Sequence, residues 1–174
     1  MTAKQRYAQA MEWTYFACIV LSGTALVAIT LMIPAGVFMR YLMNNPMSWP
    51  EPAAVVLMVM FSFIGGAAVY RANVHVAVQA LLNAVSPNIR RSMLWAVDAC
   101  MGATALFMIG YGIHLCVITR FQSMAEFPWL SVAFVYLPIP VSGFLTLLFL
   151  IERVWAGSPA ATSIMYRDQA TELE

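Results

Sequence analysis

Long stretches without charged side chains divide this sequence, and this feature limits the possible folds more than any other. Four stretches with at most one charged side chain each cover residues 13–39, 53–71, 92–119 and 127–151. Arg71 closes the second stretch, and Asp98 and His114 interrupt the third. A helix that crosses the hydrocarbon core of a bilayer needs roughly 20 predominantly apolar residues. The sequence therefore predicts an all-α integral membrane protein with four transmembrane helices.

The composition agrees with lipid as the main solvent. Hydrophobic residues make up 62% of the chain and charged residues 10%, against roughly 45–50% and about 25% in soluble domains. A net charge of +1 gives no field that would attract nucleic acid. We expect residues 1–157 to form a single four-helix membrane domain in contact with the lipid bilayer, a polar C-terminal tail over residues 158–174, and no nucleic-acid partner.

Basic residues indicate how the four helices are oriented. Most of the Lys and Arg residues lie in segments that alternate to one side of the membrane: Lys4, Arg6, Arg71, Arg90, Arg91, Arg153 and Arg167. Arg40 and Arg120 lie on the other side. Because cytoplasmic loops carry the excess of Lys and Arg, we expect a multi-pass membrane protein with both termini in the cytoplasm. The first apolar stretch exceeds the roughly 7–15 residues of a signal-peptide core, so we expect it to remain as the first span.

Aromatic and proline residues add local detail. Trp13 and Tyr15 are expected to anchor the start of the first helix at the membrane interface. Pro34 in the first stretch, and Pro138 and Pro140 in the fourth, each lack a backbone donor. We therefore expect the first and fourth helices to be kinked or locally unwound.

The segment Val74–Val85 has a different pattern. His75, Gln79 and Asn83 recur every four residues and would form one polar stripe on an apolar helix. Two interpretations stay open. The segment is either an interfacial helix on the cytoplasmic side, between spans two and three, or the end of a long second helix that stops before Pro87.

Ionisable residues inside the spans are few, which bears on function. Ion-coupled transporters and channels place such residues deep in the membrane, along ion and substrate pathways. Asp98 lies near the cytoplasmic end of the third stretch, and we expect a structural ion pair, with Arg91 or with a charge on a partner. His75 and His114 are expected at opposite membrane depths, so they cannot share a haem or a metal ion.

Other chemistry is not indicated by the sequence. Cys18, Cys100 and Cys116 all fall within apolar stretches, where we interpret them as small residues within the membrane rather than as disulfide or metal-ligand positions. We find no phosphate-binding glycine loop, nucleophile elbow or metal-binding histidine motif. We expect no catalytic activity and no cofactor in this chain.

Three groups of residues nevertheless resemble a known family. The first is the run from Arg40 to Glu51, with Asn44, Pro46 and Trp49 between them. The second comprises the glycines 65–66, the segment 70–75 with its Arg and His, and the proline and arginines within 87–91; the third is the Pro, Trp and Tyr pattern within 128–140. In this order, and with four spans, they resemble the DctQ-like small permease subunits of tripartite ATP-independent periplasmic (TRAP) transporters.

This resemblance implies a three-part system of the bacterial inner membrane. A DctP-like periplasmic binding protein would capture an organic anion, such as a carboxylate or acidic sugar, and a large DctM-like membrane subunit would import it with a sodium gradient. The small subunit would be a scaffold for the large one, with no substrate site of its own. Sodium is then expected in the partner subunit, not in this chain.

Several polar and aromatic residues are our candidates for structural or interface positions, and none is offered as a substrate ligand: Arg40, Trp49, Glu51, Arg71, His75, Arg90, Arg91 and Asp98. Arg40 and Glu51 are predicted to form an ion pair that fixes the first two spans on the periplasmic side. Glu51 would also lie at the positive end of the second helix dipole.

Two other functions stay open from the residues alone. The chain could be a self-sufficient small oligomeric transporter that uses Asp98. It could also be a membrane redox subunit, which predicts haem absorbance in the purified protein.

Overall fold

The computed structural model describes residues 3–72 and 86–156 of the chain, and these residues are helical apart from the connections. The helices are α1 (Ala3–Tyr41), α2 (Pro50–Ala72), α4 (Pro87–Thr119), α5 (Ala133–Tyr136) and α6 (Pro138–Ala156). Within the described ranges there is no strand, only an isolated bridge between Ser123 and Ser131. The described residues do not include His75, the rest of Val74–Val85, or residues 158–174, so the predictions made for these residues stay predictions.

Four helical segments are long and apolar enough to cross a bilayer, as predicted: Arg6–Tyr41, Pro50–Ala72, Ile89–Thr119 and Ala133–Trp155. The last begins at Ala133 rather than at residue 127. Residues before it form a loop, in which the Met124 N–H donates to the Leu130 carbonyl and the Val132 N–H to the Gln122 carbonyl. These cross-loop bonds use backbone groups that a helix would need along its own axis.

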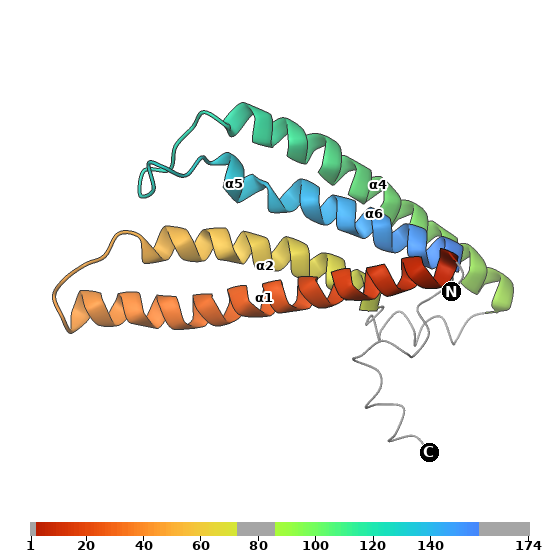
Figure 1. The fold of residues 1–174 in the computed structure, drawn as a ribbon, viewed down its shortest axis with the longest axis horizontal. Coiled ribbons are helices and arrows are strands. Elements are labelled where there is room, and N and C mark those ends of the chain that lie inside the picture. The colour runs from red at the N-terminus through yellow and green to blue at the C-terminus, as the bar shows by residue number, and fades with distance from the viewer. Residues whose placement is uncertain (1–2, 73–85, 157–174) are drawn as a thin grey trace, which may run out of the picture.

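The helices pack in the spatial order α1, α2, α6, α4. Helix α1 packs mainly against α2, α2 also against α6, and α6 against α4. Figure 1 shows the α1–α2 pair and the α4–α6 pair converging at the end where α1 begins and α6 finishes, and separating toward the other end. The start of α1 and the end of α6 therefore lie on the same side of the four-helix bundle, as an even number of crossings requires. That this side faces the cytoplasm stays a prediction from the Lys and Arg distribution.

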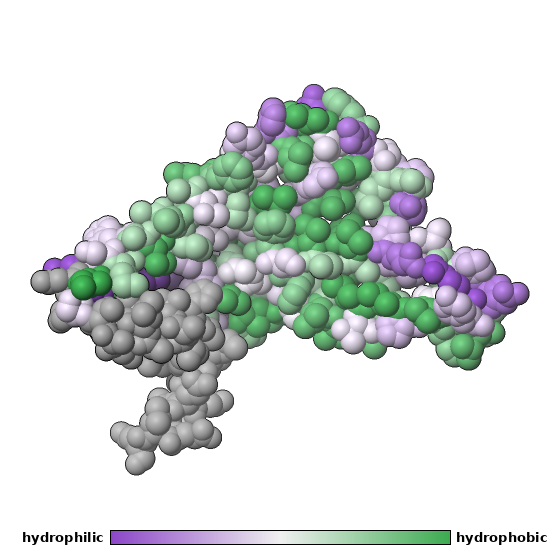
Figure 2. Space-filling model, turned by 180° about the vertical axis from the view of Figure 1, so that it is seen from behind, coloured by the Kyte–Doolittle hydropathy of each residue, from purple (hydrophilic) through white to green (hydrophobic). Residues whose placement is uncertain are grey.

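The outward faces of the helices are largely apolar. Leu31 is 68% exposed and Phe107 is 60% exposed, and many other large hydrophobic side chains point outward. Figure 2 shows hydrophobic residues over the middle of one face and hydrophilic residues toward its extremities. A monomer in water rarely exposes contiguous apolar patches above a few hundred Å². Lipid, or another membrane protein, must cover these faces.

Glycines allow the two helices of each pair to approach closely. A Cβ on Gly112 of α4 would lie 2.7 Å from Pro140 Cδ of α6, and one on Gly143 would lie 2.9 Å from the Ala105 carbonyl oxygen. Gly65 of α2 similarly leaves room for Ser22 of α1, whose Oγ would lie 3.4 Å from an added Cβ. Small residues at such contacts are typical of membrane helix packing.

The prolines act differently in the two helices that contain them. Pro34 lies inside α1, which continues to Tyr41 without interruption, so the unwinding considered for this helix does not occur. In the fourth span, Leu137 interrupts the helix between α5 and α6. Pro138 and Pro140 together remove two backbone donors within three residues, whereas Pro34 removes one from a long helix. The predicted local unwinding is therefore confirmed only in the fourth span.

Candidate functional site

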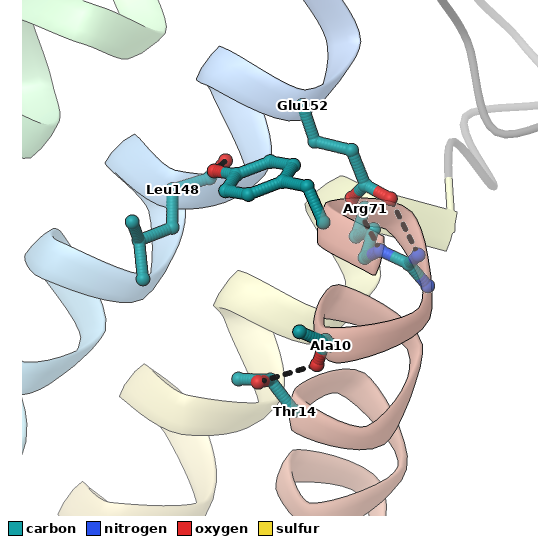
Figure 3. A network of polar contacts seen from close by, with 6 residues as sticks. Ala10, Thr14, Arg71, Leu148 and Glu152 are labelled. Carbon is teal, nitrogen blue, oxygen red and sulfur yellow. Dashed lines mark hydrogen bonds and ion pairs between the residues drawn. The ribbon is translucent and has the colours of Figure 1, made fainter. Parts of the chain in front are cut away.

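A buried ion pair joins the C-terminal ends of α2 and α6. Arg71 Nε lies 2.8 Å from Glu152 Oε2, and Arg71 Nη2 lies 2.8 Å from Oε1, so both carboxylate oxygens accept a bond from the guanidinium. Figure 3 shows the two side chains directed at each other. Their side chains are 6% and 3% exposed. This bidentate geometry is the strongest form of an Arg–carboxylate contact.

Aromatic rings surround the Arg71 guanidinium. Its Cζ lies 5.0 Å from the centroid of the Tyr15 ring of α1 and 5.6 Å from that of Phe149 of α6. A cation over an aromatic face gains electrostatic attraction from the ring. Tyr15 is only 4% exposed, so its expected role as an interface anchor is wrong. Tyr15 lies inside the bundle, where its ring packs against the Arg71 guanidinium.

Helix α1 also contacts α6 near this pair. The Tyr7 hydroxyl donates to the Leu148 carbonyl over 3.1 Å. The Tyr7 and Trp155 rings meet edge to face, with centroids 5.9 Å apart. The buried core continues from here, formed by Met11, Tyr15, Cys18, Ile64, Ala67, Ala68, Tyr70 and Phe149. The polar contacts and the buried core therefore lie at the same end of the bundle, where Figure 1 shows the helix pairs converging.

A second ion pair connects α4 to α6 at this end. Arg153 Nε lies 3.4 Å from Asp98 Oδ1, and the two side chains are 18% and 16% exposed. Tyr70 of α2 lies close enough to interact with both charges. The expected structural pairing of Asp98 is present, but its partner is not Arg91. Seven residues separate Arg91 from Asp98, a rise of about 10 Å along a helix, whereas α6 brings Arg153 alongside.

These two pairs, Arg71–Glu152 and Asp98–Arg153, form what we call the paired-charge cluster. Each carboxylate in it has a guanidinium partner, and the four side chains come from three helices. Removing one partner of a buried ion pair typically costs about 3–5 kcal/mol, because the other charge is left uncompensated. The arrangement is suited to holding helices in register. It offers no free carboxylate that would bind a cation or carry a proton along a pathway.

The predicted contact between Arg40 and Glu51 is also present. Arg40 Nη2 lies 2.6 Å from Glu51 Oε1, and the side chains are 44% and 73% exposed. Glu51 lies in the first turn of α2, as predicted. Trp49 is exposed just before this helix, and its carbonyl accepts a bond from the Ala53 N–H. Asn44 allows the chain to leave α1 because it adopts a left-handed conformation, with φ of 50°.

The remaining candidates are not gathered into a site. Arg90 and Arg91 lie exposed in the first turns of α4, far along that helix from His114, which is exposed near its other end. The cysteines are free thiols at separate places. Among the described residues, no three His, Cys, Asp or Glu side chains are grouped so that they would hold a metal ion.

Sequence reasoning missed Glu152 and used Arg153 only to orient the chain. A signal was available: spans two and four run in the same direction, so their C-terminal ends lie at the same depth, and Arg71 ends one while Glu152 ends the other. Opposite charges at equal depth in low dielectric attract strongly. Which of the two arginines faces which carboxylate depends on helix rotation, and the hydropathy pattern does not specify that rotation.

The fold and the paired-charge cluster define a class: a multi-pass helical membrane protein whose buried charges connect its own helices. A comparison with family profiles goes further. Residues 29–159, more than half of the chain, match the family described as tripartite ATP-independent periplasmic transporters, DctQ component. The chain belongs to this family. Among curated proteins, no match was found.

Family membership confirms the resemblance drawn from the sequence and makes the chain the small subunit of a TRAP transporter. It is thus a transporter component, which is a different class from the enzymes. The tripartite family implies a DctM component and a DctP component as partners.

Proposed function

We propose that this chain is a scaffold for the large subunit of a sodium-coupled TRAP transporter and has no substrate or ion site of its own. The complex would import an organic anion, a carboxylate or an acidic sugar, delivered by the periplasmic binding protein. The sodium ions would bind in the large subunit.

The observation that carries this proposal is the position of the ionisable side chains. No Asp, Glu, Lys, Arg or His occurs in residues 13–39, 52–70, 99–113 or 133–151, which include the middle of the four spans. The one buried carboxylate of the described ranges, Glu152, and the partly buried Asp98 both lie at one end, and both face an arginine. A transport pathway through this chain would need polar groups at the midplane, where ion and substrate sites of secondary transporters lie.

The self-sufficient transporter that uses Asp98 is disfavoured for the same reason. Asp98 would have to exchange its contact with Arg153 for a transported ion. Its side chain is 16% exposed and lies near Tyr70 of the buried core.

The test is reconstitution. The tagged chain is purified from cells that also make the large subunit, and uptake of candidate organic anions is measured in proteoliposomes with an imposed sodium gradient. We expect a stoichiometric complex, and uptake that is lost when the small subunit, the large subunit or the binding protein is omitted.

The matched variant for this assay is Asp98→Asn, which removes the charge and keeps the shape. We expect the complex that contains it to transport wherever it assembles. Solute flux through the chain alone, abolished by D98N, would overturn the scaffold proposal and favour the self-sufficient transporter.

A further inference from the structure

The first turns of α4 carry a basic surface that the paired-charge cluster does not use. Arg90 and Arg91 are exposed, and neither forms an ion pair with a carboxylate of the described ranges. Trp95 follows Arg91 by one turn, so the two share a helix face, and Trp95 is 63% exposed. We call these three residues the α4 basic surface.

The side chains that the structure describes differ in charge between the two ends of the bundle. Among side chains that the structure describes at the end where α1 begins, the arginines 6, 71, 90, 91 and 153 outnumber the carboxylates 12, 98 and 152 by two. At the opposite end, the arginines 40 and 120 are balanced by the carboxylates 51 and 126. Because Arg71 and Arg153 are held in ion pairs, the excess positive charge rests on the exposed arginines. The surface is therefore complementary to an anionic partner.

The position of this surface along α4 indicates the partner. Helix α4 has 33 residues, a length of about 50 Å, whereas the hydrocarbon core of a bilayer is about 30 Å thick. The first turns of α4 therefore extend past the hydrocarbon into the headgroup layer. Arginine at headgroup depth, with a tryptophan one turn deeper, is the usual arrangement at a membrane interface. Guanidinium groups also match the geometry of phosphate oxygens.

We propose that the α4 basic surface binds the phosphate headgroup of an anionic phospholipid, with Arg90 and Arg91 on the phosphate and the Trp95 indole against the adjoining acyl chain. This binding does not depend on the transport function or on the other two components. It is a property of the chain alone in a membrane.

The test uses the full chain reconstituted in vesicles of equimolar phosphatidylglycerol and phosphatidylcholine. The chain is extracted in mild detergent, and the lipids that remain bound are quantified by mass spectrometry. Each basic residue near an anionic surface is worth roughly fivefold in partitioning. We expect phosphatidylglycerol to be retained preferentially, and this preference to fall by about 10–25-fold in R90Q/R91Q.

Three controls keep the outcome decisive. R90K/R91K should keep most of the preference, because the charge is retained. R120Q removes an exposed arginine at the other end and should leave the preference unchanged. Helical content and unfolding are measured for each variant, so that loss of fold is separated from loss of lipid. An unchanged preference in folded R90Q/R91Q, or an equal loss in R120Q, would overturn the proposal.

Discussion

The Arg71–Glu152 pair predicts an unusual order of stabilities among three variants. Arg71→Met leaves the Glu152 carboxylate without its partner in a site where its side chain is 3% exposed. The cost of leaving such a charge unpaired is about 3–5 kcal/mol, and solvent screening does not reduce it much at this depth. Loss of the guanidinium from the Tyr15 and Phe149 rings adds about 0.5–2 kcal/mol. Glu152→Met should cost a similar amount, because it leaves Arg71 unpaired.

The double variant R71M/E152M should be more stable than either single variant. Neither charge is then buried, and two unbranched side chains fill most of the volume. Replacing a buried ion pair with hydrophobic residues is often close to neutral. We therefore expect the free energy of unfolding of the double variant to lie within about 2 kcal/mol of that of the natural chain, and we attribute the remaining difference to the lost ring contacts. The coupling energy between the two sites should therefore be several kcal/mol, well above the roughly 0.5 kcal/mol scatter of independent sites.

The assay is reversible unfolding in mixed micelles, in which the denaturing detergent fraction is raised and the loss of helicity is followed. The matched control is the same cycle at the exposed pair, R40M/E51M, where coupling should stay below about 1 kcal/mol. If the free energies of R71M and E152M simply add in the double variant, the pair does not hold α2 to α6, and the reasoning about the paired-charge cluster is wrong.

Three further predictions use the same unfolding assay. Gly112→Ala should lower the free energy of unfolding by about 1–3 kcal/mol, since the new methyl would meet Pro140. The control Gly110→Ala meets nothing within 4 Å and should be neutral or stabilising by up to ~1 kcal/mol. Equal effects of the two variants would refute the close contact of α4 with α6. Arg40→Ala should cost less than about 1 kcal/mol, because its ion pair is exposed to solvent; a larger loss would mean that this pair does fix the first two spans. Asp98→Asn should destabilise the chain less than Glu152→Met does, because the Asp98 pair is longer and more exposed, and the reverse order would contradict that ranking.

The sequence was sufficient for the fold because one physical rule dominates it. A backbone that crosses hydrocarbon must satisfy its own hydrogen bonds, so each long apolar stretch has to be a helix. Charge-free stretches mark those helices, and turn residues such as Asn44 mark where they end. The start of the fourth span was misplaced because residues 127–132 are as free of charge as the span itself, and cross-loop hydrogen bonds show that they belong to the loop before it.

The paired-charge cluster was only partly predictable for a different reason. Arg71 and Asp98 were found because a charge at the edge of an apolar stretch is conspicuous. Their partners depend on how α6 is rotated about its axis, which follows from the close contacts of Gly112 and Gly143 with their neighbours. That information is spread over two helices and does not appear in the periodicity of either one. Arg40 and Glu51 were easier, since a short connection brings them together.

Two consecutive residues of helix α6 connect it to the helices on its two sides. Neighbouring residues on a helix point about 100° apart, so Glu152 and Arg153 face different sides: Glu152 contacts α2 and Arg153 contacts α4. Exchanging them in E152R/R153E leaves composition, hydropathy and net charge unchanged. It places a second guanidinium against Arg71 and a second carboxylate against Asp98.

We expect this exchange to cost at least the roughly 3–5 kcal/mol of removing one partner, because like charges would replace opposite ones at both contacts. Adding R71E and D98R to the exchange restores opposite charges at each contact and should recover part of the loss. If E152R/R153E instead unfolds like the natural chain, then the order of these two residues is irrelevant to packing, and α6 is positioned by its glycine contacts alone. The exchange thus tests the arrangement of the charges at unchanged composition, and partial recovery in the fourfold variant would assign the loss to charge.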